Sequence, residues 1–183
     1  MCIKSRFILI IGIFLLLINR NFARHIVGGE IYYECIGMDP INNRVTFQFT
    51  MNVYRDCFST NSAELDPEAQ IGFYVQNSSL NYVPYGTADV KLSSSRTLDP
   101  TNNNPCIIPP RVCVQEGVYT FTRTFDIINS SYVVVYQRCC RNNTISNILD
   151  PDKQGAAFYV EITPEAQRLC NSSPRFKNFP PIV

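Results

Sequence analysis

A strict two-residue alternation in the stretch RVTFQFTMNVYRDC constrains the fold of this chain more than any other feature. Apolar Val45, Phe47, Phe49, Met51 and Val53 take every second position, and polar or small hydroxyl residues fill the positions between them. Successive side chains of a β-strand point to opposite faces, so this pattern predicts a half-buried strand with one face on a core. Such a strand needs a sheet around it.

The remaining apolar stretches predict more strands of the same kind. Residues 26–53 are expected to form a long hairpin, because GMDPINN supplies a turn between two strand-like runs. Residues 118–127 should place Tyr119, Phe121 and Phe125 on one sheet face. PEAQRLC, residues 164–170, is the one stretch that favours a helix, with Pro164 in its first turn. Further strands are expected at residues 71–77, 80–86, 87–93, 131–139 and 156–163.

These elements predict an all-β fold with little helix. The expected architecture is an antiparallel two-sheet β-sandwich of seven to nine strands, Ig-like or jelly-roll-like. Residues 97–113, TLDPTNNNPCIIPPRVC, form a long proline-rich loop, since Pro105, Pro109 and Pro110 prevent regular ladder hydrogen bonding.

Residues 1–23 have the pattern of a secretory signal peptide. Lys4 and Arg6 precede the apolar run from Phe7 to Ile18, and small Ala23 offers a cleavage point. The alternative is a membrane anchor, but the run is shorter than the roughly 18 residues that a spanning helix requires. We therefore expect one extracellular domain over residues 24–183, located outside the cell or on its outer surface, with no transmembrane segment in the mature chain.

The charge of the mature chain is close to neutral. Removing residues 1–23 leaves 13 basic and 15 acidic side chains, a net charge of −2. No basic block remains, so the sequence predicts no nucleic-acid partner.

Seven cysteines follow the leader, and disulfides are the expected state of exported cysteines. No Cys-x-x-Cys pair occurs and His25 is the only histidine, so no metal site is predicted. Cys106 and Cys113 flank a stiff six-residue stretch and are predicted to pair. The vicinal Cys139 and Cys140 are expected to have separate partners, since neighbouring strand side chains point apart. Cys57 is predicted to pair with Cys140, and Cys35, Cys139 and Cys170 then supply one bridge and one free thiol.

The sequence offers no catalytic residues and no cofactor site. IVGG at residues 26–29 is the start of many chymotrypsin-like proteases, but the only histidine, His25, would be lost by cleavage before Ile26. A two-carboxylate glycosidase stays open as an alternative among 15 acids. The abundant tyrosines and phenylalanines could stack on sugars, although at alternating strand positions they are more often core.

Several unusual strings carry a resemblance to a known family. HIVGGEIYYEC, VYRDC, PCIIPPRVCVQEGVY, YQRCCRNNTISNI and SPRFKNFPPIV follow one another in this order. Together they resemble the N-terminal domain of large exported surface proteins of the Bacteroidetes, which carry PKD-type or Ig-like repeats and many of which end in a gliding-motility-associated module. Relatives continue past PPIV with another cysteine and then repeat domains. The resemblance thus implies either a truncated multidomain protein or a stand-alone copy with a free thiol.

The resemblance implies a non-catalytic, structural or adhesive module of the cell surface. Its expected partners are other surface proteins or extracellular glycans. The alternative is a secreted glycan-binding, or less readily glycan-cleaving, β-sandwich protein. The ligand and the oligomeric state cannot be obtained from the sequence.

Overall fold

The computed structural model describes residues 26–58, 63–98, 112–142 and 145–176. These residues form seven strands, one short 3₁₀ turn and one short helix, as the alternating sequence pattern predicts. The elements are β1 (Ile26–Asp39), β2 (Arg44–Asp56), β3 (Glu68–Gln76), β4 (Tyr82–Leu98), β5 (Val114–Asp126), β6 (Tyr132–Cys139), η1 (Pro151–Lys153), β7 (Gly155–Ile162) and α2 (Pro164–Leu169).

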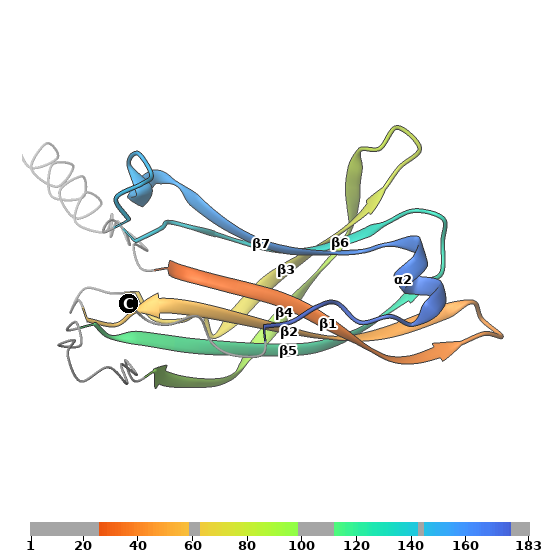
Figure 1. Ribbon diagram of the computed structural model, residues 1–183, viewed down its shortest axis with the longest axis horizontal. Coiled ribbons are helices and arrows are strands. Elements are labelled where there is room, and N and C mark those ends of the chain that lie inside the picture. The colour runs from red at the N-terminus through yellow and green to blue at the C-terminus, as the bar shows by residue number, and fades with distance from the viewer. Residues whose placement is uncertain (1–25, 59–62, 99–111, 143–144, 177–183) are drawn as a thin grey trace, which may run out of the picture.

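All seven strands belong to one antiparallel sheet, in the order β1-β2-β5-β4-β3-β6-β7. Strand β4 joins its two halves, because Tyr82 to Lys91 pairs with β3 while Leu92 to Leu98 pairs with β5. The sheet curls into an open half-barrel (Figure 1). The predicted antiparallel all-β fold is confirmed. The division into two separate sheets is not, since β4 runs from one half into the other.

The core lies on the concave side of the curled sheet. Val45, Phe47, Phe49 and Met51 of β2 are fully buried, which confirms the alternation read from the sequence. Tyr119 and Phe125 are buried beside them and Phe121 packs against the same core, so the predicted shared face of β5 is also confirmed. Burying each of the aromatic rings contributes about 1.5–3 kcal/mol. The inner face of the sheet is therefore the main source of stability.

The open side of the half-barrel lies between the edge strands β1 and β7. Side chains and residues 170–175 close it. Phe158 of β7 lies directly on Gly29 of β1, where a Cβ atom would meet the ring at 2.7 Å. Residues 170–175 then run along β1, and we call them the strap. Ser173 accepts a hydrogen bond from Tyr33 N at 2.9 Å, and Ser172 accepts one from Cys35 N at 3.1 Å.

A disulfide and a helix fix the start of the strap. Cys35 of β1 is bonded to Cys170, 135 residues away. The preceding helix α2 begins at Pro164, with the Thr163 hydroxyl accepting from Ala166 N at 3.1 Å. This confirms the helix predicted for PEAQRLC, with proline in the first turn and a hydroxyl cap before it. Within the described residues no helix has the length and apolar character needed to cross a membrane.

Candidate functional site

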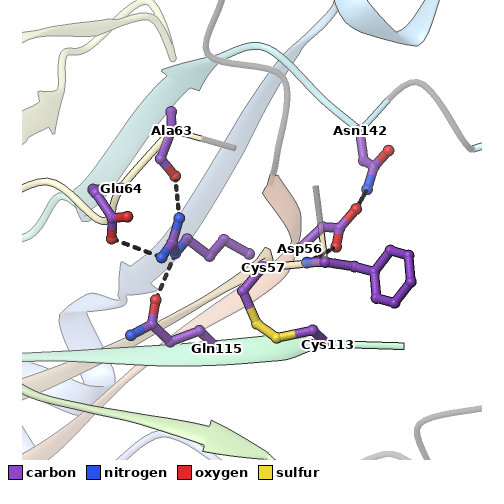
Figure 2. Close-up of a disulfide and its surroundings, with 9 residues drawn as sticks. Asp56, Cys57, Ala63, Glu64, Cys113, Gln115 and Asn142 are labelled. Carbon is purple, nitrogen blue, oxygen red and sulfur yellow. Dashed lines mark hydrogen bonds and ion pairs between the residues drawn. A yellow bond between two sulfur atoms is a disulfide. The ribbon is translucent and has the colours of Figure 1, made fainter. Parts of the chain in front are cut away.

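Two regions of the described chain combine polar chemistry with an unusual geometry: the end of the half-barrel where β2 stops and β5 starts, and a groove on the outer face of β3. At the first, Asp56 pairs with Val114 in the β2–β5 register, and Cys57 N donates to Cys113 O at 2.9 Å. The two cysteine Cα atoms then lie 5.0 Å apart and the side chains are bonded (Figure 2). The register of two buried strands thus selects this disulfide.

Arg55, the residue before this end, is almost completely buried and satisfies its guanidinium with three acceptors (Figure 2). It donates to Gln115 Oε1, to Ala63 O and to Glu64 Oε2, each at 2.6 Å. Because a buried cation is costly unless it is paired and hydrogen-bonded, this arrangement holds residues 63 and 64 against β2 and β5. Its role is structural.

Asp66 forms a second polar cluster in the same region. Its carboxylate accepts from Tyr136 Oη at 2.8 Å and pairs with Arg138 Nη2 at 2.7 Å, while its backbone oxygen accepts from Tyr119 Oη at 2.7 Å. A cavity of about 30 Å³ beside this cluster is large enough for a single water molecule. The polar groups here hold one another, so this cluster also anchors the chain rather than presenting a site.

The disulfides differ from the predicted pairings. Cys113 is bonded to Cys57 rather than to Cys106, and Cys57 is therefore not available to Cys140. Cys35 is bonded to Cys170, so neither of them bridges to Cys139. Sequence proximity suggested Cys106 for Cys113, whereas strand register brings Cys57 opposite it. Cys106 and the only histidine, His25, lie outside the described residues, so the predicted free thiol is not placed.

Cys139 and Cys140 are bonded to each other, which corrects the prediction of separate partners. The prediction assumed strand geometry at both residues, where neighbouring side chains point to opposite faces. Strand β6 ends at Cys139, so Cys140 lies outside that geometry, and the peptide bond between the two is cis. This pair stands at the same end of the half-barrel, where Arg141 forms an isolated bridge with Ile26 of β1.

The second region is a groove of about 390 Å³ on the outer face of the sheet. It runs across β3 and its two neighbours, β4 and β6. The side chains that define it alternate with the buried Ile71 and Phe73, which places them opposite the core. The lining includes Glu68, Gln70, Gly72, Tyr74, Thr87 and Gln137, and Asp66 and Arg138 lie at one end.

Tyr74 forms the aromatic part of the groove. A Cβ atom added at Gly72 would lie 3.0 Å from Tyr74 Cε2 and 3.5 Å from its hydroxyl. The same atom would lie 3.5 Å from Val135 Cγ1 of β6. The tyrosine ring therefore leans back along its strand over Gly72, and the missing side chain at Gly72 makes room for it.

The polar side chains around Tyr74 are not used for hydrogen bonds within the described part of the protein. Within the described part of the chain, Gln70, Thr87, Gln137 and the Tyr74 hydroxyl make no side-chain hydrogen bond to another residue. Sequence analysis did not single these residues out. The alternation of residues 71–77 places Gly72 and Tyr74 on the polar face, but the pairing of β3 with β6 is needed to bring Gln137 beside them.

Metal chemistry finds no support in the described residues, where no three His, Cys, Asp or Glu side chains gather into a cation site. Comparisons with protein families, with curated proteins and with solved structures return no match for this chain. The function is therefore inferred from the geometry of the chain itself.

Buried tyrosines make the fold sensitive to alkali. Burial, and next the nearby Asp66 carboxylate, raises the pKa of Tyr119 from 10.0 to about 12, and burial likewise raises the pKa of Tyr54, Tyr132 and Tyr136. A raised pKa in the folded state means that unfolding releases protons once the pH exceeds 10. We expect the contribution of these tyrosines to the free energy of unfolding to be constant below pH 10 and to fall as the pH rises toward about 12.

Urea unfolding of thiol-blocked protein across this pH window, with tyrosinate absorbance followed in parallel, measures the effect. Tyr119→Phe should show a smaller alkaline loss than the parent chain, because the phenyl ring has no proton to release. An unfolding free energy that stays constant up to pH 12 would contradict the assignment of these groups.

Proposed function

We propose that the chain is a non-catalytic module of an exported cell-surface protein, with a structural or adhesive role. The single observation that carries this proposal is the pair of long-range disulfides, Cys35–Cys170 and Cys57–Cys113, which span 135 and 56 residues. Disulfides of this kind persist in oxidising compartments outside the cytosol. The predicted leader over residues 1–23 supports the same location.

An Ig-like sandwich is the finer fold that we propose for this module. Strands β1, β2 and β5 with the second half of β4 follow the order of the A, B, E and D strands of that fold. The first half of β4 with β3, β6 and β7 follows the order of the opposite sheet. Tyr132, at the start of β6, donates to Asp126 O at 3.1 Å, as the tyrosine corner of Ig-like domains does.

The polar clusters support a structural rather than a catalytic reading. The guanidinium of Arg55 and the carboxylate of Asp66 are occupied by partners that fix the segment between β2 and β3. The resemblance of HIVGGEIYYEC and YQRCCRNNTISNI to Bacteroidetes surface proteins supports the proposed location at the outer cell surface.

Surface labelling of the native host tests this function. Antibodies raised against residues 26–176 are expected to label intact cells as strongly as permeabilised cells, because the module faces the outside. Brief protease treatment of intact cells should remove the labelling, while a cytosolic control protein keeps its own. Labelling that requires permeabilisation would contradict the proposal.

Glycan binding is the second candidate function, and one observation favours it. The outer-face groove combines a leaning tyrosine with amide and hydroxyl side chains that lack partners among the described residues. This arrangement is the basis of the inference that follows.

A further inference from the structure

We propose that the groove over Gly72 is a binding site for a neutral saccharide. This inference rests on the proposed surface function, of which it would be the adhesive part. The residues that would make the site are Glu68, Gln70, Gly72, Tyr74, Thr87 and Gln137, contributed by three adjacent strands.

The leaning Tyr74 supplies an apolar platform. Its ring packs over Gly72 beside Val135 rather than standing away from the sheet. The aliphatic face of a sugar ring can pack on such an aromatic face, and the hydroxyl at the edge of the ring can still hydrogen-bond. Gly72 favours this arrangement, because a Cβ atom there would lie 3.0 Å from Tyr74 Cε2 and the ring would have to shift.

Amide and hydroxyl groups surround the platform. Gln70 on β3, Thr87 on β4 and Gln137 on β6 are exposed, and their polar atoms make no side-chain hydrogen bond within the described chain. Each glutamine offers donors and an acceptor together, which suits adjacent sugar hydroxyls that both donate and accept. All three side chains line the same groove as Tyr74 and come from three adjacent strands, with Thr87 opposite Gly72 and Gln137 at the Gln70 end.

Size and charge narrow the ligand class. A groove of about 390 Å³ lies within the volume range of small-ligand pockets. The groove lining holds two acidic side chains, Asp66 and Glu68, and one basic side chain, Arg138, which is paired with Asp66; Lys91 lies across from Glu68 in the β3–β4 register but is not part of the lining. This excess of negative charge favours a neutral saccharide over a sialylated or sulfated one.

The test uses the disulfide-intact chain and a panel of disaccharides: the neutral cellobiose, maltose, lactose and mannobiose, and a sulfated chondroitin disaccharide. Amide resonances are followed by NMR at ligand concentrations up to about 10 mM, where an interaction with a Kd near 1 mM would be close to saturation. We expect at least one neutral disaccharide to shift the amides of Gly72, Tyr74 and Gln137, and the sulfated one to leave them unchanged.

Variants then distinguish a loss of saccharide binding at the groove from a general loss of the folded state. Tyr74→Ala is expected to weaken binding of the neutral disaccharide by at least about tenfold, the loss of one aromatic contact. Gly72→Val should abolish binding while the fold is retained, because a β-branched residue suits a strand and its side chain fills the groove. The matched controls Tyr32→Ala on β1 and Gln48→Ala on β2 lie in the other half of the sheet and should bind normally.

Three results would overturn the proposal: no shift with any neutral disaccharide, equal binding of the sulfated disaccharide, or normal binding by folded Gly72→Val. Failure of this site is distinguishable from failure of the proposed function. A chain that labels on intact cells but binds no saccharide remains a surface module whose groove has another role.

Discussion

The double substitution Cys35→Ser/Cys170→Ser is expected to lower the free energy of unfolding by about 5 kcal/mol, because this disulfide closes a loop of 135 residues. The loop term grows with the logarithm of its length, which makes this the most stabilising of the three disulfides in the described chain. The strap would also lose its covalent anchor on β1, leaving the hydrogen bonds of Ser172 and Ser173 and the ion pair between Arg175 and Glu34. Since a domain is typically stable by only about 5–15 kcal/mol, the variant should lose at least about a third of its stability.

The vicinal pair provides the matched control. Cys139→Ser/Cys140→Ser also removes one disulfide and two sulfur atoms, but it releases a loop with a sequence separation of 1. In the same chain-entropy account it should cost less than about 1 kcal/mol. Both variants are made in a Cys106→Ser background, so that no additional thiol exchanges, and are compared by urea unfolding. Equal losses in the two variants would mean that the long-range disulfide does not form as described.

Local patterns in the sequence predicted the elements of this fold well. The alternation from Val45 to Val53 identified the central buried strand, because a half-buried strand requires that period. Pro164 identified the first turn of α2, because a proline at that position is a local signal of a helix start. Features whose physical cause lies within one strand or helix could therefore be predicted from the sequence.

Strand β4 shows where local reading fails. The sequence predicts two strands, at residues 80–86 and 87–93, but the chain runs through Pro84 and Gly86 as one strand with a register shift opposite Phe73 and Tyr74. Proline is tolerated here because, among the described residues, this half of β4 has β3 on one side and no strand on the other. Its missing N–H is therefore not needed for a second ladder. The continuity of β4 depends on how the whole sheet is paired. It makes the fold one curled sheet rather than two separate sheets.

The disulfides and the groove depend on strand order in the same way. Cys57 faces Cys113 because β2 pairs with β5, and no property of the residues between them predicts this pairing across a sequence separation of 56. Gln137 lines the same groove as Gln70 because β6 pairs with β3, although β4 and β5 lie between them in the chain. Pairing between strands that are distant in the sequence determines the disulfide partners and the groove lining, and local sequence patterns do not reveal that pairing.

Gln167→Ala is expected to destabilise the fold by about 3 kcal/mol, because it would leave three backbone groups without their partner. Gln167 is fully buried in α2. Its Nε2 donates to Ser130 O at 2.8 Å and to Ile162 O at 3.2 Å, and its Oε1 accepts from Ile128 N at 2.9 Å. One amide therefore ties the helix to the β5–β6 connection and to the end of β7, and alanine offers none of these hydrogen bonds.

The variant Gln167→Glu separates the hydrogen bonds from the packing, because glutamate has nearly the same shape. Its carboxylate could still accept from Ile128 N, but it would place an oxygen against the carbonyls of Ser130 and Ile162. Burial raises the pKa of such a carboxyl, so this variant should be unstable at neutral pH and regain stability as the pH falls and the group becomes a donor. Urea unfolding at several pH values measures both effects, with the exposed Gln154→Ala as the neutral control. If Gln167→Ala unfolds at the same urea concentration as Gln154→Ala, or if Gln167→Glu shows no gain at low pH, then the buried amide does not hold these three segments together.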